Sequence, residues 1–119
     1  MITKEISGLR AISENYEIFI LDLWGTIYDG QALFPGIKTL LEQLKNRDKK
    51  VVFLSISPQL PEEVHQRLGR LGLSTLHYDH LVTSGGEANS QLISMESKEF
   101  SAFNGKVFEI GPNRFPNTC

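Results

Sequence analysis

The sequence predicts an α/β fold built on a parallel, doubly wound sheet. Two observations lead to this prediction. Short apolar runs alternate along the chain with segments of helical periodicity, and the first two of these runs end abruptly in a polar residue. This alternation favours parallel strands joined by right-handed crossovers. The chain has 119 residues, enough for one small domain with a modest core.

Three apolar runs are expected to form the strands of this sheet. The first strand is expected over residues 17–23, the second over residues 51–54 and a short third strand over residues 80–83. Uninterrupted apolar runs are typical of strands that are buried on both faces of a parallel sheet. Residues 106–110 are a candidate for a further strand. Three strands are few for a doubly wound sheet, which indicates part of a larger protein.

Helical periodicity predicts three helices between and before these strands. Apolar residues recur at helical spacing over residues 3–14 and 37–47. A third helix is expected to begin at Pro61, because proline suits the first helical position, and to end near Gly72.

Two further signals mark a helix start and a turn. Residues 84–87, Ser-Gly-Gly-Glu, have the pattern of a capping box that opens another helix, with Leu92 and Ile93 expected to face inward. Residues 27–34 carry an Asp-Gly pair near their centre, which predicts a hairpin turn.

Composition and charge argue against several classes of function. The net charge is −2, so the chain has no electrostatic footprint for nucleic acid. No apolar run approaches the roughly 20 residues of a membrane span, and the N-terminus lacks a secretory signal. The single cysteine, Cys119, excludes an internal disulfide. We therefore expect a cytoplasmic protein that binds neither nucleic acid nor membrane.

Asp22 is the residue on which a functional hypothesis depends. It ends the first apolar run, whereas Ser55 ends the second, and the ligands of open α/β sheets bind at such strand ends. A carboxylate in this place can act as a nucleophile or bind Mg²⁺. Gly25 lets the backbone approach a phosphate, and the hydroxyls of Thr26 and Ser55 can bind phosphoryl oxygens. An equally good interpretation is that Asp22 and Ser55 only cap the turns after their strands.

Several motifs resemble one known family. Residues 22–26, Asp-Leu-Trp-Gly-Thr, resemble the first motif of the haloacid dehalogenase superfamily, an Asp-x-Asp-Gly-Thr/Val signature after an apolar strand. Ser55, which follows Val-Val-Phe-Leu, is similar to its second motif. Residues 28–44 and 78–88 resemble the branch of NagD-type nucleotide and sugar-phosphate phosphatases. The resemblance extends over residues 5–112.

For the fold, the resemblance implies a partial three-layer Rossmann-like core and the beginning of a cap. Residues 1–84 would form the N-terminal part of the core, and residues 85–119 would begin an α/β cap domain that is truncated here. The hairpin at residues 27–34 would be a flap over the site.

For the chemistry, the resemblance implies hydrolysis of phosphate esters through an aspartyl-phosphate. Asp22 would be the nucleophile, and Mg²⁺ would be held by Asp22 and the backbone carbonyl of Trp24. Gly25, Thr26 and Ser55 would bind the phosphoryl group of a small phosphorylated molecule.

Trp24 departs from the family pattern. It stands where family phosphatases carry a second Asp, which protonates the leaving oxygen and then activates water. Such acid–base help contributes roughly 10²–10⁴-fold, and an indole cannot provide it. The dehalogenases of the superfamily carry an aromatic residue there, and a NagD-like subgroup carries Asp-Leu-Trp-Gly. The family's third motif, a Lys, and its fourth, an acidic pair, lie beyond residue 119. We therefore expect this chain to be weakly active or inactive and to bind Mg²⁺ weakly.

Three functional interpretations stay open at this point. The first is the N-terminal part of a haloacid dehalogenase-like hydrolase. The second is a non-catalytic binding or interaction module with the same fold. The third, a response-regulator-like receiver, is disfavoured because the chain lacks the expected acidic cluster near its N-terminus. The chain is expected to form a homodimer or to bind the missing C-terminal part of the same protein.

Other polar residues are given structural interpretations. His65 is expected to face solvent on its helix, and His77 and His80 to belong to a loop that leads into a strand. Gly85 and Gly86 are expected to cap a helix rather than cradle a phosphate.

Overall fold

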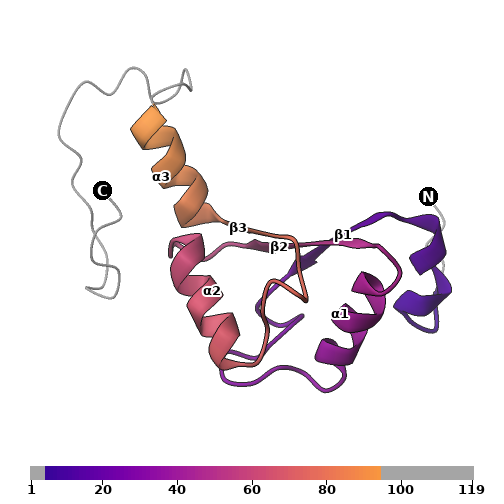
Figure 1. Cartoon of the computed structure of the whole chain (residues 1–119). Helices are drawn as coiled ribbons and strands as arrows, with labels where there is room; N and C mark the ends of the chain where they lie inside the picture. The colour runs from indigo at the N-terminus through magenta and orange to yellow at the C-terminus, as the bar shows by residue number, and fades with distance from the viewer. Residues whose placement is uncertain (1–4, 95–119) are drawn as a thin grey trace.

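The computed structural model describes residues 5–94, which form one parallel sheet with helices beside it (Figure 1). In chain order, the elements are η1 (Leu9–Ala11), η2 (Ser13–Asn15), β1 (Ile18–Asp22), α1 (Ile37–Lys45), β2 (Lys50–Ser55), α2 (Pro61–Arg70), β3 (His80–Thr83) and α3 (Ser84–Ser94). This order confirms the predicted α/β fold. The candidate strand at residues 106–110 and most of the expected cap segment lie outside the described residues.

The sheet has three strands in the order β1-β2-β3, and both pairs are parallel. In register, Phe19 lies opposite Val51, while Phe53 lies between Leu21 and Leu81. All three strands therefore end at the same edge of the sheet, as ligand-binding α/β sheets require.

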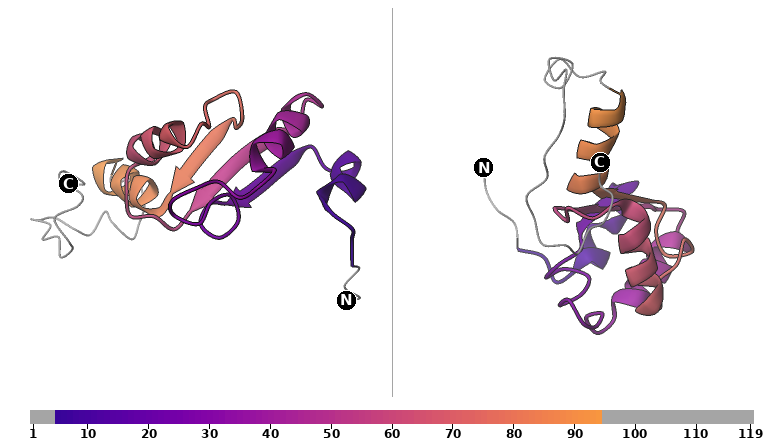
Figure 2. Two further views of the ribbon diagram at one scale, coloured as in Figure 1. Left: turned by 90° about the horizontal axis from the view of Figure 1, so that it is seen from below. Right: turned by 90° about the vertical axis from the view of Figure 1, so that its left-hand side faces the viewer.

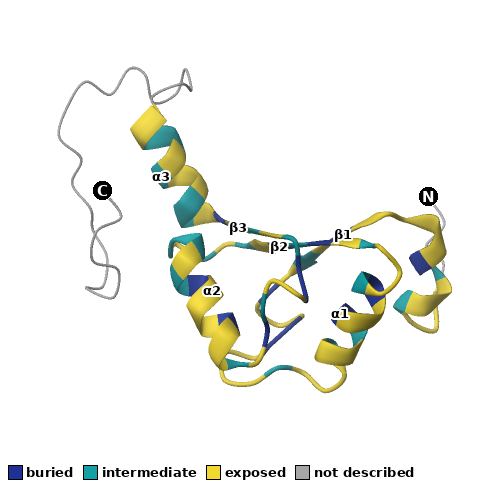
Figure 3. Cartoon of the chain, viewed as in Figure 1, coloured by how far each residue is buried: buried dark blue, intermediate teal, exposed yellow. Residues whose placement is uncertain are grey.

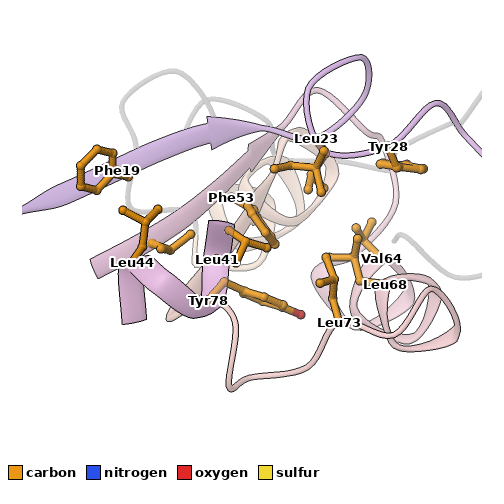
Figure 4. Close-up of a cluster of buried hydrophobic side chains, with 12 residues drawn as sticks. Phe19, Leu23, Tyr28, Leu41, Leu44, Phe53, Val64, Leu68, Leu73 and Tyr78 are labelled. Carbon is orange, nitrogen blue, oxygen red and sulfur yellow. The ribbon is translucent and has the colours of Figure 1, made fainter. Parts of the chain in front are cut away.

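The core lies on one face of this sheet, between the strands and the helices α1 and α2 (Figures 1 and 4). The rings of Phe53 and Tyr78 stack with centroids 4.6 Å apart. Burying side chains of this size contributes about 1.5–3 kcal/mol each. The buried apolar residues are Phe19, Leu23, Ile27, Tyr28, Leu41, Leu44, Val51, Phe53, Val64, Leu68, Leu73 and Tyr78.

The opposite face of the sheet is open within the described residues (Figure 3). Ile18 and Ile20 on β1 are 58% and 65% exposed, Leu54 on β2 is 49% exposed, and Val82 on β3 is 39% exposed. The expectation that these strands are buried on both faces is therefore wrong for residues 5–94. The reason is that α1 and α2 lie on the same side of the sheet (Figure 2). Both crossovers are right-handed and run in the same direction across the sheet, so they place their helices on one face.

The expected helix over residues 3–14 is replaced, in its described part, by the two short 3₁₀ turns η1 and η2. Gly8, with φ of 152°, precedes the first turn outside the helical region. The Ser13 hydroxyl donates to the carbonyl of Arg10 at 3.3 Å. Side-chain bonds of this kind compete with the helical backbone pattern. Arg47, just after α1, pairs with Glu14 at 2.8 Å and ties these turns to the domain.

Helix α3 begins as expected but is capped one residue earlier than the sequence pattern indicates. The Thr83 hydroxyl accepts a hydrogen bond from the backbone N–H of Gly86 at 3.0 Å. Ser84 is already helical. Glu87 accepts a hydrogen bond from the Gln91 side chain at 2.8 Å. The predicted capping box between Ser84 and Glu87 is therefore wrong, because Thr83 takes the capping role.

Helix α3 extends away from the sheet (Figure 1 and the right-hand view of Figure 2). Leu92 is half-buried, but Ile93 is 75% exposed, so the expectation that Ile93 faces inward is wrong. Within residues 5–94, no helix has both the length and the apolar character needed to cross a membrane.

An ion-pair cluster at Asp79 joins the amino ends of the strands to α1. Its carboxylate lies 2.6 Å from Lys45 Nζ and 3.4 Å from Lys50 Nζ, and accepts the N–H of Val51 at 2.8 Å. The hydrogen bond from Lys45, followed by the one from Val51, lowers the pKa of Asp79 from 3.8 to about 2. No sequence pattern indicates this cluster, because its members are far apart in the chain.

Candidate functional site

Asp22 and Ser55 end neighbouring parallel strands. Asp22 lies opposite Leu54 in the β1–β2 register, so Ser55 is the next residue along the adjacent strand. Both residues therefore lie at the carboxyl edge of the sheet, where the sequence predicts them. What either residue does there stays a prediction.

A tight turn follows Asp22 and is organised around the carbonyl of Leu23. This oxygen accepts the N–H groups of Thr26 at 3.3 Å, Ile27 at 2.8 Å and Tyr28 at 3.2 Å. Gly25 has φ of 79°, a left-handed conformation that favours glycine, and its N–H donates to the carbonyl of Tyr28 at 2.9 Å. The sharp turn places Thr26 in an exposed position just beyond the strand end.

The Asp22 carboxylate is exposed and makes no hydrogen bond or ion pair with any residue between 5 and 94. A turn-capping role for Asp22 is therefore not seen.

Trp24 is 69% exposed. Its indole lies against the backbone at Gly30, where an added Cβ atom would lie 3.3 Å from the indole Nε1. Among the described residues, no backbone N–H donates to the carbonyl of Trp24, so its lone pairs stay available.

Ser55 does cap the turn after its strand. Its half-buried hydroxyl oxygen accepts the N–H of Ser57 at 3.2 Å. The turn-capping interpretation is therefore correct for Ser55, yet it does not exclude a second role. A serine hydroxyl that accepts one hydrogen bond still has its own proton to donate.

The segment at residues 27–34 forms a short turn rather than an extended hairpin. A single antiparallel bridge joins Tyr28 to Leu33. Asp29 accepts the N–H groups of Gln31 and Ala32, both at 2.8 Å. Both hydrogen bonds lower the pKa of the Asp29 carboxyl group, and the one from Ala32 has the larger effect. The predicted turn at Asp29 is present, whereas its role as a flap over Asp22 stays a prediction.

Gly85 and Gly86 serve close packing at the start of α3. The N–H of Gly85 donates to the carbonyl of Ser57 at 3.0 Å, and that of Gly86 donates to Thr83. A Cβ at Gly85 would overlap the Pro58 carbonyl, and one at Gly86 would lie 2.6 Å from Pro61. Both N–H groups are engaged, so neither is available to cradle a phosphate.

The oxygen atoms near Asp22 match a magnesium site in kind but not in number. Mg²⁺ requires an octahedral set of oxygen ligands. The Asp22 carboxylate and the Trp24 carbonyl are two oxygen groups of this kind. The described part of the chain holds no cluster of three or more His, Cys, Asp or Glu residues suited to a metal ion.

The histidines have structural roles that the sequence only partly indicates. His65 is exposed, but its Nδ1 lies 2.5 Å from the hydroxyl of Tyr78, so it does not simply face solvent. Burial raises the pKa of Tyr78. His77 is buried, and its Nδ1 accepts the N–H of Ser74 at 3.0 Å within the loop before β3, as expected of a loop residue.

Comparison with known proteins gives one family match. The model of the family described as haloacid dehalogenase-like hydrolase matches residues 19–118. An acid sugar phosphatase from Staphylococcus saprophyticus is 31% identical over 85 residues, which cover 71% of this chain and 32% of that protein.

Two solved structures resemble the described fold. A haloacid dehalogenase-like family hydrolase from Brucella suis 1330 superposes with a TM-score of 0.65 at 24% identity, covering 72% of this chain and 32% of the other. A hypothetical protein from Pyrococcus horikoshii OT3 superposes with a TM-score of 0.54 at 28% identity, covering 66% of this chain and 30% of the other. The chain therefore spans about a third of the length of each protein that it matches.

Proposed function

Because the chain belongs to the haloacid dehalogenase-like hydrolases, we propose that it carries the nucleophile of a phosphate-ester hydrolase. The observation that carries this proposal is the exposed Asp22 carboxylate, which has no partner within residues 5–94 and lies beside the end of β2. The similarity to an acid sugar phosphatase supports a small phosphorylated molecule as substrate.

The proposed reaction has two displacement steps. A carboxylate oxygen of Asp22 attacks phosphorus, and the bond from phosphorus to the leaving oxygen breaks, which gives an aspartyl-phosphate. Water then attacks phosphorus, releasing inorganic phosphate and restoring the carboxylate. The hydroxyls of Thr26 and Ser55 donate to phosphoryl oxygens in both steps, and Gly25 permits close backbone approach.

Magnesium belongs to the same proposal. When bound by the Asp22 carboxylate and the Trp24 carbonyl, Mg²⁺ would offset negative charge on the phosphoryl group. Two protein oxygens form an incomplete set, so we propose weak binding.

Trp24 makes the second step slow. Its indole cannot take a proton from water or give one to the leaving oxygen, and such help contributes roughly 10²–10⁴-fold. Leaving groups of low pKa, which need no protonation, should be favoured. The aspartyl-phosphate should therefore accumulate instead of turning over.

Trp24 also favours one alternative, a non-catalytic module with the same fold. An exposed indole two residues along the chain from an available carboxylate is suited to holding a ligand that is never cleaved. The alternative requires that Asp22 binds but does not react.

The proposal extends to domain organisation and location. Residues 1–84 are proposed as the N-terminal part of the hydrolase core, and residues 85–119 as the start of a cap domain. The sequence, with a single cysteine, fits a cytoplasmic protein.

Burst kinetics with p-nitrophenyl phosphate and Mg²⁺ distinguish the hydrolase from the module. We expect the chain to release one equivalent of p-nitrophenol and then almost none. Asp22→Asn should lose the burst. Asp48→Asn, at the turn after α1 and thus at the opposite edge of the sheet, should keep it. No burst from the native chain, or an equal burst from Asp22→Asn, would reject Asp22 as nucleophile and favour the module.

A further inference from the structure

We propose that Trp24 makes the candidate site selective for ligands that carry an aromatic ring next to their phosphoryl group, such as the phosphate monoester of a phenol. The flat face of the indole would stack on that ring. This inference rests on the proposed function in one respect, the placement of the phosphoryl group at Asp22. It adds the class of substrate, and it does not require that the ester is cleaved.

Trp24 and Asp22 leave the chain on the same side. The residue between them, Leu23, is 1% exposed and points into the core (Figure 4). Both of its neighbours are exposed. Side chains alternate along an extended chain, so residues two apart share a side and lie roughly 6–7 Å from each other. When a phosphoryl group is at the Asp22 carboxylate, a ring joined to it through the ester oxygen is therefore within reach of the indole.

The indole is held at one edge and open elsewhere. An added Cβ atom at Gly30 would lie 3.3 Å from Nε1 and 4.0 Å from Cδ1 of Trp24, and both atoms belong to the five-membered ring. The side chain nevertheless stays 69% exposed. Aromatic rings attract one another in offset-stacked or edge-to-face arrangements, beyond the effect of buried area. The exposed part of the indole is therefore a surface suited to a second ring.

The turn that carries Gly30 is itself well ordered. Gly30 has φ of 104°, a conformation that favours glycine, and its missing side chain leaves room for the indole. Tyr28 is buried and forms a bridge with Leu33 across the turn. Asp29 accepts two backbone N–H groups of the turn, both at 2.8 Å. The indole is thus positioned before a ligand arrives, which lowers the entropy lost on binding.

Ile56 supplies a second apolar side chain at the same edge of the sheet. It directly follows Ser55 and is 90% exposed. Asp22 pairs with Leu54 in the register of β1 and β2, so Trp24 and Ile56 each stand two residues beyond a paired position. Neighbouring strands are about 4.8 Å apart. We therefore expect Ile56 to add apolar contact to a ring that stacks on Trp24.

The chemistry of Trp24 favours the same class of ligand. The indole N–H is a donor only and has no proton that it can transfer to a leaving oxygen. A phenol has a pKa near 10, as the tyrosine side chain does, whereas the hydroxyls of sugars are weaker acids. A phenolate therefore needs less protonation as it leaves. Stacking and leaving-group chemistry both favour an aryl ester over a sugar phosphate.

Binding of benzylphosphonate tests the proposal without turnover, because its carbon–phosphorus bond has no leaving oxygen. Cyclohexylmethylphosphonate is the matched control, with a six-carbon ring that has no π-face. Titrations in the presence of Mg²⁺, followed by phosphorus NMR, measure both dissociation constants. We expect the native chain to bind benzylphosphonate about two- to tenfold more tightly than the control, the range for aromatic pairs. The ring protons of benzylphosphonate should shift upfield, as protons over an aromatic face do.

Three variants assign the preference to Trp24. Trp24→Leu should remove both the preference and the upfield shift, whereas Trp24→Phe should keep part of each. Leu76→Asn, which replaces an exposed residue in the loop before β3, should keep both in full. Circular dichroism checks that the variants stay folded. Equal affinities of the native chain for the two phosphonates, a preference that survives Trp24→Leu, or no binding of either compound would overturn the proposal.

The burst with p-nitrophenyl phosphate separates this inference from the proposed function. A burst from a native chain that binds the two phosphonates equally would reject the role of Trp24 and keep Asp22 as nucleophile. A preference for benzylphosphonate without a burst would support the role of Trp24 and reject Asp22 as nucleophile. The chain would then be a module that binds aryl phosphates without cleaving them.

Discussion

At the scale of single residues, Trp24 governs how far the chemistry proceeds. If the indole only fails to supply acid–base help, a carboxylate in its place should restore turnover. We expect Trp24→Asp to raise steady-state hydrolysis of p-nitrophenyl phosphate by up to roughly 10²-fold, the lower end of the range for acid–base catalysis. Trp24→Phe is the matched control, and its steady-state rate of hydrolysis should not increase. Equal rates for the two variants would show that position 24 does not limit the reaction.

Asp79 is the residue whose charge should matter most for stability. Its folded pKa of about 2 lies below the value of 3.8 for the free side chain. A lowered pKa stabilises the fold above pH 4, and this contribution disappears as the pH falls from about 4 to about 2.

The variant Asp79→Asn tests this pH dependence. At pH 7, we expect it to lower the free energy of unfolding by about 1–3 kcal/mol, because Lys45 and the Val51 amide lose their charged acceptor. The difference in the free energy of unfolding between the variant and the native chain should shrink as the pH falls from 4 to 2. Urea unfolding at several pH values measures this difference. A difference that is constant with pH would show that the ion pair contributes no charge-dependent stability.

At the scale of elements, the contact between the loop before α2 and the start of α3 depends on small residues. A Cβ at Gly85 would overlap the Pro58 carbonyl, a rigid backbone group. We expect Gly85→Ala to destabilise the chain by about 1–3 kcal/mol, as overpacking does. Thermal unfolding, monitored by circular dichroism, provides the comparison.

Gly69, within α2, is the matched control because a Cβ there meets open space. Gly69→Ala should stabilise the chain by up to about 1 kcal/mol through helix propensity. The two substitutions are chemically identical and should have opposite signs. Two shifts of the same sign would contradict the packing at Gly85.

The elements also show which structure can be predicted from sequence. The strands β1, β2 and β3 and the helices α1 and α2 lie within two residues of their expected bounds, because each has a strong period or a clear boundary residue such as Pro61. Of the helix expected over residues 3–14, the described part forms 3₁₀ turns instead. Apolar spacing gives no information about the Ser13 side chain, which donates a hydrogen bond back to Arg10.

The candidate site is predictable only where chain order determines it. Parallel strands bring their carboxyl ends together, so the sequence predicts Asp22 and Ser55 at one edge. The hydrogen bond from Ser57 to Ser55 agrees with the turn-capping interpretation of the sequence. The contact between Trp24 and Gly30 depends on turn geometry, which no single-sequence pattern encodes. The same holds for the Asp79 cluster, whose partners are brought together only by tertiary folding.

At the scale of the whole molecule, the described chain has one covered face and one open face. The sheet, α1 and α2 form a core, and the carboxyl edge presents Asp22 beside the free edge of β1.

Mass mapping of the quenched reaction tests the central claim most directly. The chain is mixed with p-nitrophenyl phosphate and Mg²⁺, quenched in acid within the burst, and digested. We predict that the peptide containing Asp22 gains the mass of one phosphoryl group, and that Asp22→Asn gains none. A native chain without a phosphoryl group, or one that carries it on a peptide lacking Asp22, would contradict the account.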